Sequence, residues 1–406
     1  MSQVVIVGAG PAGASLAYLL ARGGVRTTLV ERRRDFSREF RGEVLVPGGM
    51  DALAQMGLTE ELARLPHQDI DHFQAWLDGK RILRLDAAEA LAEGVSLPRA
   101  SAISQPALLE MLVGKAGQYP EFQFFDGATV TSTIRSHGRI SGLNLRRDGE
   151  QLQLDCDLLI GADGRNSIVR REAGFVASPV NPPMDAVWCK LPRPVDWRGM
   201  RVYAGHGHLL IAYRSWDDQL QLAWVILKGT FKDLRERGEA NWIEEMAQHV
   251  DVDFAAHLRA RSGEVSKPFL LEAVSDRVES WSVPGCLVIG DAAHTMSPVG
   301  AQGINIALRD AIVAANHLIP VLSGPVTDQA SLDRVLGQLE AERMLEVAPI
   351  QALQARPPRL MLRTGWLGEL ARSFVARLIQ TPWIARRLAR QVEPFINGVT
   401  EVRLND

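Results

Sequence analysis

The first thirty residues contain the feature that most constrains the fold. Residues 4–7 (VVIV) form a continuous apolar run, which is typical of a strand buried on both faces of a parallel sheet. Gly8, Gly10 and Gly13 follow at once, with Ala12 inside the same turn. In a strand–turn–helix unit such glycines allow a tight turn, let backbone N–H groups approach a pyrophosphate, and let the helix lie close to the strand. The helix N-terminus then faces the phosphates.

The unit ends with a second strand and an acidic residue. Residues 27–30 make the strand and Glu31 closes it, about twenty residues beyond the glycines. A carboxylate at that point accepts hydrogen bonds from the ribose hydroxyls of an adenosine, and it would repel a 2′-phosphate. Arg32 and its neighbours Arg33 and Arg34 nevertheless leave NADP open. The sequence therefore predicts a dinucleotide site, and the choice between FAD and NAD depends on the rest of the chain.

The composition is that of an ordinary globular protein. The 406 residues are 46% hydrophobic and 23% charged, which allows a large core and two or three lobes. A net charge of −3 with mixed signs argues against nucleic acid as a partner. The three cysteines have no metal-ligand spacing, and no secretory signal or run of 18 uncharged apolar residues occurs. We expect reduced cysteines, no metal site and a cytoplasmic location.

The segment up to residue 120 offers two further candidate positions. A glycine-rich turn leads into a helix expected to start near Gly49, and Arg41 before it lies either on the surface or against the phosphates. Residues 70–86 predict a hairpin, because they alternate around an Asp-Gly turn. Residues 104–113 predict a helix capped by its first residue. Gln105, at the start of that helix, faces either a ligand or solvent.

Two more glycine turns follow strands farther along. Short strands between residues 122 and 154 suggest a small meander, and the buried strand that follows ends at Asp163 and Gly164. Residues 181–268 alternate as an antiparallel sheet does, which indicates a second lobe. The strand 286–289 returns to the parallel pattern and is followed by Asp291. In open α/β sheets ligands bind at this edge.

The tail has a different character. Residues 356–390 carry eight arginines and one acidic residue, interleaved with apolar residues at helical spacing. A basic amphipathic face can lie on an anionic membrane as a peripheral contact, although arginines extending over a packed helical lobe are the commoner explanation. The sequence leaves open whether this tail touches lipid or a second subunit of a homodimer.

Three motifs stand in one order: GAGPAG with Glu31, GADGRNSIVR at 161–170, and GDAAHTMSPVGAQGIN at 290–305. Together they resemble the single-component, FAD-dependent aromatic monooxygenases, the group typified by para-hydroxybenzoate hydroxylase and the ubiquinone-pathway hydroxylases. The resemblance covers roughly residues 1–350. It implies an FAD site made of Gly8, Gly10, Ala12, Gly13, Glu31, Arg32, Arg41, Gln105, Val130, Asp163, Gly164, Asp291, Pro298, Gly303, Ile304 and Asn305. Residue 301 is Ala where the pattern usually has Gly.

The resemblance also implies the chemistry. Reduced flavin carries negative charge near N1 and O2, and the helix N-terminus at Gly303–Asn305 would stabilise it by on the order of 1 kcal/mol. No second GxGxxG occurs, so NAD(P)H is expected to bind transiently. The reduced flavin is expected to form a hydroperoxide with O2 and to hydroxylate or epoxidise an aromatic or polycyclic small molecule. Because the flavin carries the chemistry, no catalytic side chain is assigned.

Substrate contacts are less constrained by the sequence. Tyr213 and Trp224 on second-lobe strands are the leading candidates for the substrate wall, with Met296 and Pro298 beneath the flavin, and a role in the core remains the alternative for each. His294 lies in the flavin motif, where a structural hydrogen bond is favoured over proton transfer.

Other functions of the same fold stay open. A reductase acting on isoprenoid chains is one, and a halogenase is another, although its Trp-x-Trp-x-Ile-Pro segment is absent. A non-catalytic lipid carrier is the third. The expected fold is α/β. A Rossmann-like FAD-binding domain takes residues 1–66, 98–175 and 270–345, an antiparallel substrate domain takes 67–97 and 176–269, and a helical C-terminal extension takes 346–406.

Overall fold

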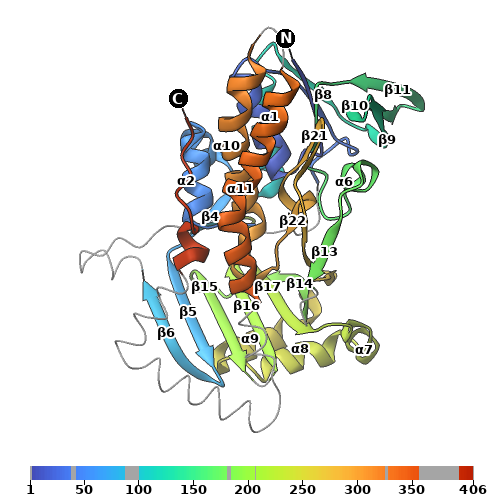
Figure 1. Ribbon diagram of the computed structural model, residues 1–406. Coiled ribbons are helices and arrows are strands. Elements are labelled where there is room, and N and C mark those ends of the chain that lie inside the picture. The colour runs from blue at the N-terminus through green and yellow to red at the C-terminus, as the bar shows by residue number, and fades with distance from the viewer. Residues whose placement is uncertain are drawn as a thin grey trace.

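The computed structural model describes residues 2–37, 43–86, 100–180, 184–205, 207–324, 328–355 and 393–405. One lobe is built on a six-stranded, mainly parallel sheet, and the other on a seven-stranded, mainly antiparallel sheet (Figure 1). None of the helices formed by these residues is long and apolar enough to span a bilayer.

The six-stranded sheet forms as the apolar run at the start of the chain predicts. Its order is β20 (Ser282–Val283), β21 (Cys286–Val288), β12 (Leu158–Gly161), β1 (Gln3–Val7), β2 (Arg26–Val30) and β8 (Phe122–Phe125). All neighbours are parallel except β20 and β21. The central strand β1 is buried from Val4 to Val7, because its side chains meet covering layers on both faces of the sheet.

Helices cover this sheet in layers. Helix α1 (Pro11–Arg22) packs against α5 (Gln105–Ala116) and α10 (Gln302–Leu322), and α11 (Gln329–Gln354) packs on α10 (Figure 1). Helix α5 begins as predicted, because the hydroxyl of Ser104 accepts a hydrogen bond from the N–H of Ala107 at 3.4 Å.

Smaller elements complete this lobe. They are the sheet β3 (Val44–Leu45), β7 (Ala100–Ile103) and β4 (His67–Ile70); the meander β9 (Thr129–Ser136), β10 (Arg139–Arg147) and β11 (Glu150–Asp155); the sheet β13 (Ala177–Val180), β19 (Ser275–Val278) and β22 (His294–Thr295); the helices α2 (Pro47–Gln55), α3 (Thr59–Arg64) and α6 (Ile168–Ala173); and the 3-10 turns η2 (Gly290–Ala292) and η3 (Val299–Ala301).

The second lobe is a sheet with helices on one face. The strand order is β18 (Phe269–Leu271), β14 (Met184–Pro192), β17 (Gln219–Leu227), β16 (His208–Arg214), β15 (Met200–Gly205), β5 (His72–Leu77) and β6 (Lys80–Asp86). Helices α7 (Phe231–Arg237), α8 (Glu239–Ala247) and α9 (Val252–Ala260), followed by η1 (Ser262–Glu264), lie along it (Figure 1). Alternation along the strands sends Trp224 into the core with these helices, where its ring stacks on Trp242 with centroids 6.0 Å apart.

The α/β fold with an antiparallel second lobe is confirmed, and so are the hairpin and the capped helix. One local prediction was wrong, and one helix start differs by two residues from its expected position. The strand at residues 122–125 pairs with β2 in the parallel sheet instead of opening the meander, because its aromatic side chains pack on the first lobe's core. The helix expected near Gly49 begins at Pro47, since proline is suited to the first helical turn.

The domain division remains a prediction, and α11 runs without a break through residues 345 and 346, where a boundary was placed. Of the C-terminal extension, the structure describes the end of α11, a short helix at 393–397 and the non-helical residues 398–405. Arg41 and the arginine-rich segment 356–390 lie outside the described residues.

A fully buried ion network joins α10 to its neighbours. The carboxylate of Asp310 accepts hydrogen bonds from His294 Nε2 at 2.7 Å, Arg343 Nε at 2.7 Å and the N–H of Gly290 at 3.0 Å. Arg343 also pairs with Glu346 at 2.6 Å. Burial raises the pKa of Asp310, but His294 and Arg343 outweigh that effect and hold the pKa below its ordinary value of 3.8.

We expect Asp310→Asn to destabilise the fold by about 3–5 kcal/mol, because it leaves Arg343 beside an uncharged amide in the core. Urea unfolding at pH 7 measures this. Asp148→Asn is the matched control, because it alters an exposed carboxylate paired with Arg34 and should change stability by less than about 0.5 kcal/mol. Since the pKa of Asp310 is lowered, its contribution is present above pH 3.8 and is lost as the pH falls through the folded-state pKa. Equal effects of the two variants would contradict the assignment.

Candidate functional site

One cavity of about 1800 Å³ reaches both lobes. It lies beyond the carboxyl ends of β1, β2 and β12, where Gly8, Glu31 and Ala162 line it, and it continues over the face of the seven-stranded sheet opposite α7–α9. Pockets for one small molecule usually measure about 300–1,000 Å³. The cavity therefore has room for a dinucleotide and a second molecule.

The glycine turn requires glycine on steric grounds. Gly8 has a φ of 102°, and a Cβ there would lie 2.4 Å from the carbonyl oxygen of Ala162 on the adjacent strand end. A Cβ at Gly13 would lie 1.9 Å from the carbonyl oxygen of Gly8. The missing side chains keep α1 close to β1 and leave the helix N-terminus open toward the cavity.

Glu31 is held firmly at the end of β2. It is 5% exposed, and its carboxylate accepts hydrogen bonds from the N–H of Ala9 at 2.9 Å and of Arg33 at 3.1 Å. Arg32 and Arg33 line the cavity beside it. A buried carboxylate at this strand end is placed where a ribose would bind.

Asp163 closes the turn after β12. Its carboxylate accepts hydrogen bonds from the N–H of Ile168 at 2.7 Å, the N–H of Val169 at 3.3 Å and the hydroxyl of Ser167. Burial raises the pKa of Asp163 despite these donors. Asp163 thus caps α6 and shapes the cavity wall, and Gly164, with a φ of 82°, lines the same wall.

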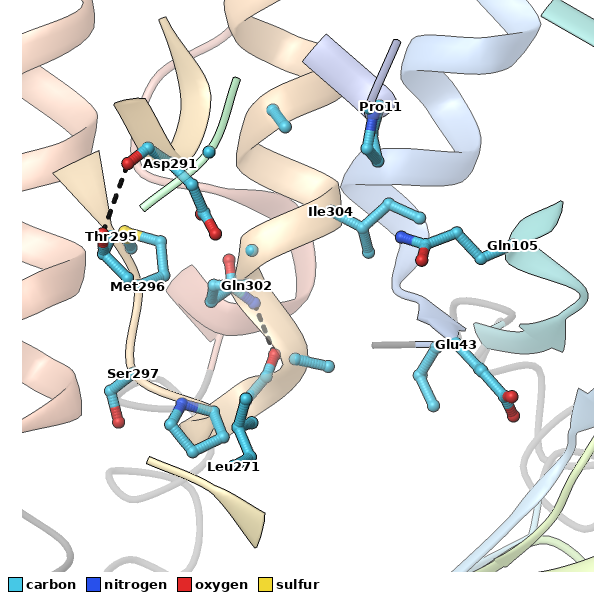
Figure 2. A pocket seen from close by; sticks show the side chains of 18 of the residues that line it. Pro11, Glu43, Gln105, Leu271, Asp291, Thr295, Met296, Ser297, Gln302 and Ile304 are labelled. Carbon is cyan, nitrogen blue, oxygen red and sulfur yellow. Dashed lines mark hydrogen bonds between the residues drawn. The ribbon is translucent and has the colours of Figure 1, made fainter. Parts of the chain in front are cut away.

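A second loop faces this wall before α10. Figure 2 shows Asp291, Thr295 and Met296 on one side of the pocket, and the hydroxyl of Thr295 donates to the carbonyl of Asp291 at 3.3 Å. Gln302 Nε2 donates to the carbonyl of Gly300 at 2.7 Å and so holds the turn before the helix. The N-terminus of α10 opens into the cavity at Gly303 and Ile304, as an anion-binding helix end does.

Ala301 lies in this loop in a left-handed conformation, with a φ of 54°. Glycine adopts that conformation without the steric cost that a Cβ brings. This geometry explains why the pattern usually has Gly at the position, and it shows that alanine still forms the turn.

Asn305 joins this loop to the rest of the lobe. Its Oδ1 accepts the N–H of Val46 at 3.0 Å, and its Nδ2 donates to the carbonyls of Val44 at 3.1 Å and Ala301 at 2.6 Å. A Cβ on Gly49 would lie 1.9 Å from Oδ1, so α2 approaches this amide closely only because residue 49 is glycine. The side chain of Asn305 thus positions β3 against α10.

Most of the residues expected from the sequence meet at this cavity. Those that line it are Gly8, Gly10, Ala12, Glu31, Arg32, Gln105, Val130, Asp163, Gly164, Tyr213, Asp291, Met296, Pro298, Gly303 and Ile304. Gly13, Asn305 and Trp224 do not line it: the first two shape the backbone around it, and Trp224 packs in the second-lobe core. Contacts of these side chains with a ligand remain predictions.

Sequence reasoning missed the buried acid Glu43 in the cavity wall. Glu43 is 7% exposed and lines the cavity, and its Oε1 accepts a hydrogen bond from Trp216 Nε1 at 3.1 Å and lies 3.6 Å from Lys190 Nζ. Burial raises the pKa of Glu43, and Lys190 only partly offsets it. The sequence did contain a signal for this ion pair. Glu43 directly precedes the apolar Val44 and Leu45, and Lys190 lies inside the mainly apolar strand β14.

Other titratable groups have structural roles. His294 is buried and bonded to Asp310, as the structural interpretation of the sequence favoured. Burial raises the pKa of the Cys156 thiol to about 12, so it is protonated at neutral pH. Within the described residues, no three histidine, cysteine or acidic side chains gather as metal ligands would.

Comparisons with known proteins agree with this geometry. Residues 1–343 match the family model described as "FAD binding domain". The 6-methylpretetramide 4-monooxygenase of Streptomyces rimosus is 32% identical over 395 residues, which cover 96% of this chain and 92% of the relative. Squalene epoxidase 1 of Arabidopsis thaliana is 26% identical, and the match covers 87% of this chain and 66% of the plant protein.

Solved structures share the fold at low identity. p-Nitrophenol 4-monooxygenase PnpA from Pseudomonas putida DLL-E4 superposes with a TM-score of 0.80 at 16% identity, covering 99% of this chain and 100% of that one. Pseudomonas aeruginosa PqsL in complex with 2-aminobenzoylacetate gives 0.77 at 22% identity, covering 94% and 100%.

The glycine cradle, the carboxylate at the end of β2 and the open N-terminus of α10 suit the pyrophosphate, ribose and ring of FAD. The family match spans most of the chain, and the Streptomyces rimosus relative matches nearly its whole length. The chain therefore belongs to the FAD binding domain family and is an FAD-dependent monooxygenase, an oxidoreductase that hydroxylates or epoxidises a small molecule.

Proposed function

We propose that this enzyme uses NAD(P)H and O2 to hydroxylate an aromatic, phenol-type small molecule with one or more fused rings. The observation that carries the proposal is the continuous cavity, with a dinucleotide-binding turn in one part and a large, mainly apolar chamber with a buried carboxylate in another. A chamber of this kind suits a flat apolar substrate that carries a polar group.

The cofactor end is assigned by the groups available there. The turn from Gly8 to Ala12 and the carboxylate of Glu31 would hold the adenosine and pyrophosphate of FAD, and Asp291 would lie near the ribityl chain. The N-terminus of α10 would stabilise negative charge on the reduced ring. Bound FAD supplies hydride acceptance and oxygen insertion, and the chain supplies position and electrostatics.

The substrate end excludes water with apolar side chains. Its walls come from β14, β15, β16 and β18, and include Trp188, Met200, Ile211, Tyr213, Phe269 and Leu271. These side chains belong to the sheet face opposite α7–α9, so the same sheet builds the second-lobe core and the substrate wall. Exclusion of water limits the wasteful release of hydrogen peroxide.

Epoxidation of an alkene is the second candidate, favoured by the apolar walls and by similarity to the plant squalene epoxidases. The two candidates are separated by incubating the purified flavoprotein with 18O2, NADH or NADPH, and either 1-naphthol or squalene. We expect one 18O atom in a hydroxylated naphthol and none in squalene. An oxygenated squalene with unchanged naphthol would favour epoxidation. NAD(P)H consumption that yields only hydrogen peroxide with every aromatic compound tested would contradict the proposal, and a protein without flavin would contradict it outright.

We also expect Glu31→Gln to weaken FAD binding roughly 10- to 100-fold, because a neutral amide replaces a charged acceptor of hydrogen bonds. Release of fluorescent flavin on dilution measures the affinity. Asp35→Asn is the control: this carboxylate lies near Glu31 in the sequence but is bonded to Ser37 and lies outside the cavity lining. Unchanged affinity in Glu31→Gln would remove Glu31 from the FAD site.

A further inference from the structure

The carboxylate of Glu43 has one satisfied and one unsatisfied oxygen. Oε1 accepts from Trp216 Nε1 at 3.1 Å, whereas Oε2 is buried and has no hydrogen-bond partner. Figure 2 shows this side chain across the pocket from Asp291 and Thr295. A buried acceptor without a donor costs about 1–3 kcal/mol, and more when it is charged. Such a group in a cavity wall is available to accept a hydrogen bond from a ligand.

The surrounding charges leave Glu43 short of a donor. Lys190 Nζ lies 3.0 Å from Asp217 but 3.6 Å from Glu43, so the cation is shared unequally. Burial raises the pKa of Asp217, but the hydroxyl of Ser215 and Lys190 outweigh it, and the pKa of Asp217 is lowered while that of Glu43 is raised. Burial and these two carboxylates raise the pKa of Tyr213, which lines the same cavity as a neutral phenol.

The position of Glu43 is fixed relative to the cofactor end. Glu43 directly precedes Val44, whose carbonyl accepts the amide of Asn305, and its own carbonyl accepts the N–H of Ile103 at 2.8 Å. Asn305 belongs to the first turn of α10, which opens into the cavity at Gly303. A substrate bonded to Glu43 would therefore be held at a defined distance from the N-terminus of α10.

A second unsatisfied group lines the same chamber. The indole Nε1 of Trp188 is buried without a hydrogen-bond partner, and Trp188 packs in a cluster with Val44 and Tyr213. The chamber thus presents one acceptor, Glu43 Oε2, and one donor, Trp188 Nε1, that form no hydrogen bond within the described residues. A ligand with a hydroxyl group and an oxygen acceptor would satisfy both. A hydrocarbon chain would satisfy neither.

We propose that Glu43 binds the phenolic hydroxyl of the substrate through Oε2 and acts as its general base. This inference rests on the proposed function. As the ring carbon bonds to the oxygen atom delivered from O2, the phenolic O–H bond breaks and its proton passes to Oε2. The O–H electron pair becomes the second C–O bond of a ketone, and a ring π pair forms the new C–O bond as the O–O bond breaks. The other oxygen atom leaves as water, with the two electrons that NAD(P)H supplies. Loss of the proton from the hydroxylated carbon to water restores the aromatic ring. The second C–O bond pair then returns to the ketone oxygen, which takes back the proton held by Glu43.

The competing interpretation is that Glu43 has only a structural role, holding Lys190 and Trp216 in place through its ion pair and its hydrogen bond. That role would stabilise the wall but would not distinguish a phenol from its ether. The proposal requires such a distinction, because 1-methoxynaphthalene has the same ring as 1-naphthol and no proton to donate.

The test is calorimetric titration of the oxidised holoenzyme with 1-naphthol and with 1-methoxynaphthalene, in wild type and Glu43→Gln. We expect wild type to bind the naphthol roughly 10- to 100-fold more tightly than the ether, as a hydrogen bond to a charged acceptor implies. In Glu43→Gln the ratio should fall to about 3-fold or less, while the ether affinity and the flavin content stay unchanged. Because the wild-type ratio needs no mutant, poor folding of the variant does not remove the test.

Asp217→Asn is the matched variant, because it removes the other carboxylate near Lys190 and lies outside the cavity lining. It should keep the preference for naphthol. The preference for naphthol should be lost when the pH falls and Glu43 becomes protonated. Since Asp217 helps to raise the pKa of Glu43, Asp217→Asn should move this loss to a lower pH. Equal wild-type affinity for the two compounds, or a preference retained in Glu43→Gln, would overturn the proposal. A naphthol preference without oxygenation would instead contradict the proposed function alone.

Discussion

The rest of the site depends on the hydrogen bonds that the buried carboxylate of Asp310 accepts. This carboxylate binds the backbone of Gly290, the ring of His294 and the guanidinium of Arg343, and so joins the segment 290–294, α10 and α11. Charges so deeply buried are costly unless every partner is present. The network therefore specifies one position for the N-terminus of α10, which is the end that faces the cavity.

A series of polar contacts continues from α10 into the second lobe. Asn305 binds the backbone on both sides of Leu45. Glu43 precedes β3 and contacts Lys190 of the seven-stranded sheet and Trp216 in the turn between β16 and β17. A chain of short polar contacts thus links the cofactor end to the substrate end through an otherwise apolar interior. We infer that the two ends are held in register by this chain of contacts as well as by the general packing of the lobes.

Local patterns predicted much of the fold and of the cofactor end. The turn at Gly8, the acid Glu31 and the turn at Asp163 are contiguous motifs whose geometry follows from backbone sterics, so they could be located from the sequence. Glu43 could not, because its significance comes from partners about 150 and 170 residues away in the sequence. Trp224 was offered as a substrate wall because it shares a lobe with Tyr213, but strand alternation sends it to the other face.

The central claim is that one cavity holds FAD at the α10 end and an aromatic hydroxyl against Glu43. A crystal structure of the oxidised holoenzyme with 1-naphthol tests it most directly. The account predicts the flavin ring beside Gly303 and Ile304, with the naphthol oxygen within hydrogen-bond distance of Glu43 Oε2. A naphthol whose hydroxyl points away from Glu43, or a flavin bound elsewhere, would contradict it.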